Sequence, residues 1–133
     1  MKYMLDTNIC IYAIKNKPYQ VVERIKENLH NGLCISIITL AELEKGVANS
    51  NYPEKNRGSL ANFLIATSIY QFDEAAAREY GEIYTNLKRK GTLIGIMDML
   101  IAAHAKSKGL ILVTNNVREF ERVEGLKLEN WAE

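Results

Sequence analysis

The sequence predicts a three-layer α/β/α sandwich, in which helices cover both faces of a mostly parallel sheet of five strands. Three observations support this fold class. Short segments made almost entirely of apolar residues are typical of strands that are buried on both faces. Segments with apolar residues at helical spacing separate them. Residues that cap or end helices stand at most of the junctions. This alternation is the pattern of a parallel sheet built from strand–helix–strand units.

The first predicted strand, residues 2–5, ends at Asp6-Thr7-Asn8, which are residue types that cap helices. A first helix is therefore expected to follow. Pro18 suits the first position of a second helix, which the apolar spacing extends to Gly32. Residues 33–40 are predicted to be the second strand, because they are rich in β-branched side chains and follow a glycine.

The next helix is indicated by Thr39 and Glu42, which have the spacing of a capping box. It is expected to run to the polar break at Asn49. Tyr52-Pro53 is expected to continue the loop after that break, and residues 60–66 are expected to be helical.

The second half of the chain repeats the alternation. Residues 68–72 are predicted to be a third short strand, and Asp73 is predicted to cap a long helix after it. A strongly apolar helix is expected from Met97-Asp98 to Gly109. Residues 110–113 and 126–128 are predicted to be the last two strands.

Length and composition limit the possible functions. With 133 residues, of which 47% are hydrophobic, the chain is expected to form a single domain over residues 1–133. The net charge of +1 means that any nucleic acid must be held by local patches. Cys10 and Cys34 lie in apolar segments and are predicted to be buried thiols. With no signal peptide and no long apolar stretch, a cytoplasmic protein without membrane contact is expected.

Polar residues follow several predicted strands. Asp6, Glu42 and the pair Thr114 and Asn116 stand at or just beyond strand ends, where ligands bind in open α/β sheets. Asp98 instead begins a helix with no strand immediately before it. Carboxylates that gather raise one another's pKa values, and a hard divalent cation such as Mg²⁺ or Mn²⁺ relieves this repulsion. Such a site can activate water against a phosphodiester.

Each acid also has a purely structural explanation, which the residues alone leave open. Asp6 could cap a helix, Glu42 could complete its capping box, and Asp98 could complement a helix dipole. His104 lies six residues after Asp98, about 240° around the helix, so it points away from the acid. A surface or interface position is expected for it. No sequence motif of a serine hydrolase, zinc protease or nucleotide-binding loop supplies a rival chemistry.

Four motifs resemble those of a known family. They are MLDTN at residues 4–8, ITLAEL at residues 38–43 with Lys45-Gly46, Ile94-Gly95 followed by Asp98 and by LIAAHA at residues 100–105, and VTNN at residues 113–116 with Glu119-Phe120. In this order and over nearly the whole chain, they resemble the PIN-domain ribonucleases and, within them, the VapC toxins of bacterial toxin–antitoxin pairs.

The resemblance assigns roles to the acids and places Asp98 at the same edge of the sheet as the others. It implies that Asp6 and Asp98 bind one metal ion, and that Glu42 binds a second ion or orients the attacking water. It also implies that Thr114 supports the cluster through its hydroxyl. Asn116 stands where the family most often has aspartate, and it offers a carbonyl oxygen without a charge. One well-held ion, with a second arriving alongside RNA, is the resulting expectation.

The resemblance further implies a Mg²⁺-dependent endoribonuclease, with Mn²⁺ as a substitute ion, that inhibits translation and growth. Its implied substrate is structured RNA, often tRNA near the anticodon and here initiator tRNA, cut to leave 5′-phosphate and 3′-hydroxyl ends. The implied partners are a second copy of the chain and an antitoxin of the VapB type, which form a hetero-oligomer together. The antitoxin's C-terminal tail would cover the site and insert a basic side chain, and operator DNA would be contacted only through the antitoxin.

Two other functions stay open at this point. One is a non-catalytic PIN-like module that only binds an antitoxin or RNA. The other is a phosphohydrolase similar to the haloacid-dehalogenase class, in which Asp6 would be the nucleophile. Asn8 argues against it, because that class has a second aspartate at this position.

Overall fold

The computed structural model describes residues 2–133, so Met1 of the predicted domain lies outside it. The first half of the described chain contains β1 (Tyr3–Leu5), α1 (Thr7–Lys15), α2 (Tyr19–Asn28), a 3₁₀ turn (Leu29–Asn31), β2 (Leu33–Ser36), α3 (Ile37–Ala48) and α4 (Pro53–Leu64). The second half contains β3 (Ser68–Tyr70), α5 (Glu74–Arg89), α6 (Ile96–Ser107), β4 (Ile111–Val113), α7 (Val117–Phe120) and β5 (Lys127–Glu129).

The five strands form one parallel sheet in the order β3-β2-β1-β4-β5, which confirms the predicted fold class. The chain builds outward from β1 on one side, through β2 and β3, and then crosses to the other side for β4 and β5. The carboxyl ends of β1 and β4, where the order reverses, are therefore the place where such sheets form ligand sites. Leu5 pairs in register with Val113, so Asp6 and Thr114 leave the sheet as neighbours.

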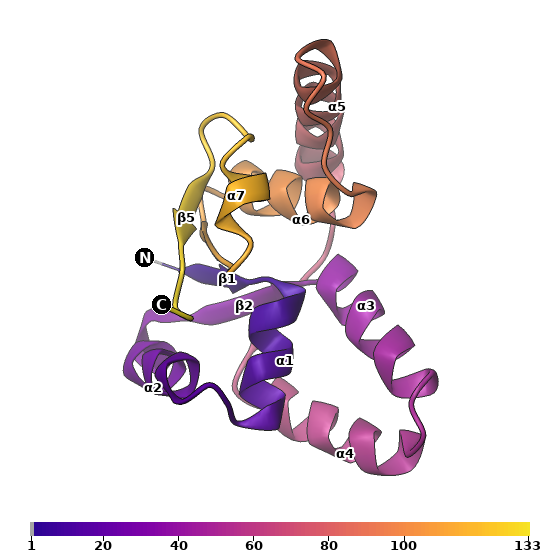
Figure 1. Cartoon of the computed structure of the whole chain (residues 1–133), viewed down its shortest axis with the longest axis vertical. Helices are drawn as coiled ribbons and strands as arrows, with labels where there is room; N and C mark the ends of the chain where they lie inside the picture. The colour runs from indigo at the N-terminus through magenta and orange to yellow at the C-terminus, as the bar shows by residue number, and fades with distance from the viewer. Residues whose placement is uncertain (1) are drawn as a thin grey trace.

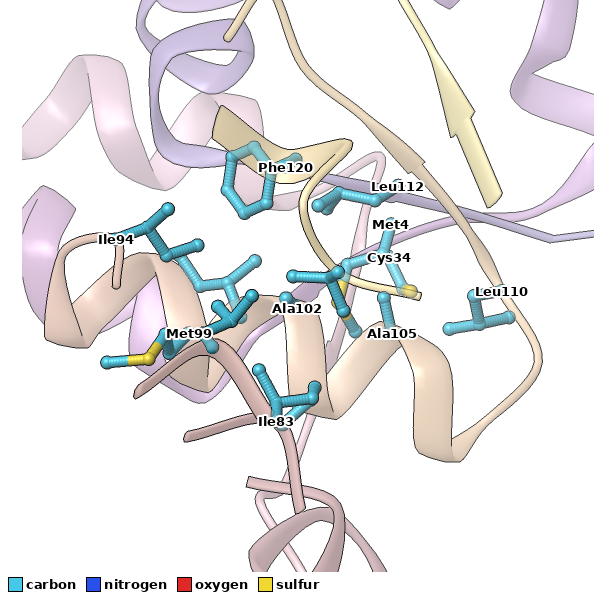
Figure 2. Packing of buried hydrophobic residues seen from close by; sticks show 14 residues of the cluster. Met4, Cys34, Ile83, Ile94, Met99, Ala102, Ala105, Leu110, Leu112 and Phe120 are labelled. Carbon is cyan, nitrogen blue, oxygen red and sulfur yellow. The ribbon is translucent and has the colours of Figure 1, made fainter. Parts of the chain in front are cut away.

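Helices cover both faces of the sheet: α1, α2, α3 and α4 on one and α5, α6 and α7 on the other (Figure 1). Successive strand residues point to opposite faces. Met4, Cys34 and Leu112 therefore pack under α5 and α6, together with Ile83 of α5 and Phe120 of α7 (Figure 2). This face of the sheet holds α6, and with it Asp98, against the central strands.

The opposite face has its own core, which the last residues of the chain close. Leu5 and Ile35 pack there against the helices α1, α3 and α4. Trp131 follows β5 and is fully buried in this core. Its indole meets the ring of Tyr3 edge-on at 5.1 Å, and its Nε1 donates to Glu129 Oε1 at 2.9 Å. The C-terminus is thus part of the packed structure that supports β1.

Replacing Trp131 with phenylalanine is expected to lower the free energy of unfolding by about 2 kcal/mol, because it removes a charge-assisted hydrogen bond and leaves unfilled volume. Urea denaturation measures the change. Tyr19→Phe is the matched control, since Tyr19 is 72% exposed and its loss of a hydroxyl should leave the unfolding midpoint nearly unchanged. Equal midpoints for Trp131→Phe and the parent would contradict the prediction.

The predicted second strand is too long. It ends at Ser36, and Ile37 begins α3 because the Ser36 hydroxyl accepts the Ile38 N–H at 3.0 Å and caps the helix there. The predicted capping box is therefore wrong: Thr39 lies buried within the first turn of α3, and Glu42 lies beyond that turn. The preference of β-branched residues for strands is small, and a good cap with tertiary packing outweighs it.

Two prolines and one helix also differ from expectation. Pro18 is the N-cap of α2 and precedes its first helical residue, Tyr19. Pro53 does not extend a loop, because it is the first residue of α4, where its fixed backbone angle suits a helix start. The short helix α7 after Asn116 was not expected.

His104 is wrongly expected at a surface or interface. Its side chain is fully buried and packs edge-on against Phe72 at 5.4 Å. Cys10 and Cys34 are confirmed as buried free thiols, and burial raises the pKa of Cys34 to about 12. Within residues 2–133, no helix has both the length and the apolar character needed to cross a membrane.

Candidate active site

Asp6 lies at the carboxyl end of the central strand β1. Its N–H donates to Val113 O of β4 at 3.0 Å, and its Oδ1 accepts the Ile9 N–H at 3.0 Å as the N-cap of α1. Only 4% of the residue is exposed. The capping explanation for Asp6 is thus correct, but a cap does not require burial, and most helix caps are made at the surface.

Burial is the main cause of the raised pKa of Asp6. Loss of water raises the pKa of its carboxyl group from 3.8 to about 6. Hydrogen bonds from the Thr114 hydroxyl and the Ile9 N–H act in the opposite direction, and the charges of Asp98 and Glu42 raise the pKa further. A positive charge bound beside this carboxylate would lower its pKa again and favour the ionised form.

Glu42 reaches the same edge of the sheet from α3. Its Oε1 accepts the Thr7 hydroxyl at 2.5 Å, which ties α3 to the start of α1. With Ser36 as the cap of α3, Glu42 takes no part in capping that helix. The capping explanation for Glu42 is therefore wrong, and helix capping does not account for its position beside Asp6.

Asp98 lies in the first turn of α6, half-buried, and the helix has no side-chain cap at Gly95. Burial raises the pKa of Asp98, and the charges of Glu42 and Glu119 raise it further. Because Asp98 and Glu42 also act on Asp6, all three predicted acids meet at one site. The structure thus brings Asp98 to the edge where only the resemblance had put it.

The loop after β4 completes this edge. Thr114 is fully buried, and its hydroxyl accepts the Asn116 N–H at 2.9 Å while it hydrogen-bonds to the Asp6 carboxylate. Asn116 is the N-cap residue of α7, but its side chain makes no capping hydrogen bond. Its amide is therefore available to a ligand rather than committed to the helix.

The comparisons with known proteins agree with this geometry. The family model described as "PIN domain" matches residues 3–126. The tRNA(fMet)-specific endonuclease VapC of Shigella flexneri is 50% identical over 133 residues, which are 99% of each chain. Ribonuclease VapC2 of Rickettsia felis is 46% identical over 98% of each chain. The chain belongs to the PIN domain family.

Solved structures of PIN proteins share the whole fold. The VapBC2 complex of Rickettsia felis, bound to a DNA fragment from its promoter, has a chain that superposes with a TM-score of 0.94 at 43% identity, over 98% of this chain and 99% of that one. The DNA-bound VapBC of Salmonella typhimurium gives a TM-score of 0.93 at 46% identity, over 98% of both chains. Membership of this family decides against the haloacid-dehalogenase type of phosphohydrolase.

A further acid near these side chains escaped the sequence reasoning. Glu119 lies in α7, and its charge raises the pKa of Asp98. Asn116 and Glu119 have the spacing of an N-cap and the third helical residue, so this pair was the signal that could have predicted both the helix and the position of the acid.

The residues present suit a divalent metal in their chemistry. Within residues 2–133, no three His, Cys, Asp or Glu side chains stand close enough together to hold an ion as they are. The donors are nevertheless hard oxygens, and burial with mutual repulsion raises the pKa of both Asp6 and Asp98. Oxygen donors of this kind are the ligands that Mg²⁺ and Mn²⁺ prefer, and the charge of such an ion would lower both pKa values.

The electrostatic coupling within the cluster can be tested directly. Glu119→Gln is expected to lower the pKa of Asp98 and to leave that of Asp6 in place, because Glu119 acts on Asp98 and not on Asp6. Glu42→Gln should lower both, with the larger effect of the two variants on Asp98. Carboxyl ¹³C titrations by NMR in EDTA measure these shifts. A Glu119→Gln variant that moves Asp6 as much as Asp98 would overturn this arrangement.

Proposed function

We propose that this chain is a Mg²⁺-dependent endoribonuclease toxin that cuts initiator tRNA. The observation that carries the proposal is the meeting of Asp6, Glu42 and Asp98 at the point where the strand order reverses, with one of them almost fully buried. The full-length identity of 50% to a tRNA(fMet)-specific endonuclease supports the same substrate class.

In this proposal, Asp6 and Asp98 hold the metal ion, with Glu42 beside it, and Mn²⁺ serves as a substitute. When bound, the ion lowers the pKa of an attacking water and neutralises charge on the phosphate. Asn116 adds a neutral carbonyl oxygen in place of a fourth carboxylate. The lower total charge favours one firmly held ion.

The side chains of the cluster divide the remaining work. The Thr114 hydroxyl and the Ile9 N–H hold the Asp6 carboxylate in one orientation. Thr7 holds Glu42 through Oε1, which leaves Oε2 free to accept a proton from the attacking water. The water oxygen forms a bond to phosphorus as the bond from phosphorus to the 3′ oxygen breaks. The 3′ oxygen gains a proton, so the products are a 3′-hydroxyl and a 5′-phosphate.

A groove beside the acids suits an antitoxin. It has a volume of about 590 Å³ and lies between α1, α3 and α4. Its walls are largely apolar, with Ile11, Ile14 and Leu60 among them, and Glu42 is one of the polar residues that line it. A VapB-type segment with an apolar face would fill the groove, and a basic side chain on it would neutralise the acids. The solved VapBC complexes support this partner.

The proposal also includes the assembly. Leu93, Ile96 and Met97 are exposed apolar side chains on the approach to Asp98, and such a patch supports a homodimer within a toxin–antitoxin hetero-oligomer. With a net charge of only +1, the chain would contact operator DNA only through the antitoxin. We place this single domain of residues 1–133 in the cytoplasm.

The test is cleavage of end-labelled initiator tRNA by the purified chain, with elongator methionine tRNA as the matched control. Cleavage is expected with Mg²⁺, is expected to stop in EDTA, and should return with added Mg²⁺ or Mn²⁺. The downstream product should be a substrate for an exonuclease that requires a 5′-phosphate. Binding of tRNA or antitoxin without cleavage under any of these conditions would favour the non-catalytic module instead.

A further inference from the structure

A single buried hydroxyl joins the two helices that carry Glu42 and Asp98. Ser36 ends β2, is fully buried and caps α3 by accepting the Ile38 N–H. Its Oγ also lies 2.7 Å from His104 Nδ1 of α6. The hydroxyl has one hydrogen to donate and a second lone pair to accept with, so Oγ forms a hydrogen bond with either neutral tautomer of the ring.

His104 is held in place by its surroundings as well as by this bond. It is fully buried against the ring of Phe72, and the Gln71 backbone carbonyl favours a proton on the ring. Nε2 makes no hydrogen bond of normal geometry in the described chain. The Ser36 contact is therefore the hydrogen bond that offsets the cost of burying a polar ring in an apolar core. An apolar side chain could fill the same space without that cost.

The same two helices also carry like charges, because the charge of Glu42 raises the pKa of Asp98. Glu42 lies six residues beyond Ser36 along α3, and Asp98 lies six residues before His104 along α6. Six residues correspond to about 9 Å of helix. The helices pack against each other, with the Ser36–His104 bond at one place and the like charges of Glu42 and Asp98 at another. The bond thus opposes the separation that the charges favour.

We propose that His104 is a positioning residue, which acts through Ser36 to set the distance between Glu42 and Asp98 and thereby the affinity of the site for a divalent cation. The inference rests on the proposed metal site, because the spacing of Glu42 and Asp98 affects cation affinity only if both carboxylates face the same bound ion. Partners that orient metal ligands commonly contribute about 10- to 100-fold to metal affinity.

The experiment measures Mn²⁺ binding to the metal-free chain by calorimetry, and RNA cleavage separately. His104→Leu keeps an apolar side chain but loses the bond, and about tenfold weaker Mn²⁺ binding is expected. His104→Asn can place an amide oxygen where Nδ1 was, so it should restore most of the affinity. Ser107→Ala is the matched control on α6, since its hydroxyl bonds only to the His104 carbonyl in the described structure. In the cleavage assay, His104→Leu should lower kcat and leave the KM for RNA unchanged.

Ser36→Gly is the second route to the same answer if His104→Leu does not fold. Glycine is well tolerated as an N-cap, so this variant removes the hydroxyl with little effect on α3. Parent-like Mn²⁺ affinity in the variants that lack the bond would overturn the proposal, as would failure of His104→Asn to recover affinity. A parent chain that binds no Mn²⁺ would overturn it too. A parent that binds Mn²⁺ in a His104-dependent manner but cuts no RNA would refute the proposed nuclease and leave the positioning role standing.

Discussion

Asp6→Asn is expected to reduce cleavage of RNA by at least about a hundredfold, the upper end of the loss that follows from removing an outer partner of a metal site. The amide is isosteric with the carboxylate, and its Oδ1 can still accept the Ile9 N–H, so α1 keeps its cap. What disappears is the negative charge at the buried centre of the cluster. The rate of tRNA cleavage at saturating Mg²⁺ measures the loss.

Asp73→Asn is the matched control for this prediction. Asp73 caps α5 in the same way, with its Oδ1 accepting the Ala76 N–H at 3.0 Å, but it lies outside the acid cluster. Its replacement should leave the cleavage rate at the parental level. Equal activity of Asp6→Asn and the parent would refute the role given to Asp6, whereas equal loss in both variants would indicate a defect in folding.

Asp6→Asn is also expected to stabilise the metal-free chain at neutral pH. Because burial raises the pKa of Asp6 from 3.8 to about 6, the native state retains a proton that the unfolded state has already lost. The contribution of Asp6 to the unfolding free energy of the parent is therefore largest below pH 4, and it falls as the pH rises toward 6. The shift corresponds to about 3 kcal/mol, since each pKa unit is worth about 1.4 kcal/mol.

Urea denaturation in EDTA between pH 4 and pH 8 measures this effect. The difference in unfolding free energy between Asp6→Asn and the parent should grow from pH 4 to pH 6 and then stay constant in favour of the variant. Asp73→Asn should instead be less stable than the parent by an amount that hardly changes over most of this range, because the ion pair with Lys108 and the Ala76 N–H lower the pKa of Asp73 and place its pH dependence mainly below pH 4. If the difference in unfolding free energy between Asp6→Asn and the parent does not change with pH, burial does not raise the pKa of Asp6.

The sequence predicted the strands better than the boundaries between strand and helix. The strands β1 and β4 were recognised because their side chains are apolar on both faces, a pattern that needs no knowledge of neighbours. The end of β2 was misplaced because Ile37, Ile38 and Thr39 are strand-forming types. Their helical state depends on the cap at Ser36 and on burial that the local pattern does not reveal.

The candidate site was predicted in the same uneven way. Asp6 and Thr114 follow recognisable strands, so their meeting follows from a parallel sheet. Glu42 was predicted as a site residue. The alternative that it completes a capping box is wrong, because that box does not exist. Glu119 was missed because α7 is a single turn, too short for an apolar repeat to indicate it.

Hydrophobic pattern and residue type determined the layers, the parallel sheet and the acids worth considering, because burial on a periodic element is a local property of the chain. Only the tertiary structure decided that the charge of Asp98 acts on Asp6, and that His104 is buried and bonded to Ser36. Those contacts join residues 92 and 68 positions apart. They depend on how α6 crosses the sheet and α3, which a single sequence does not encode locally.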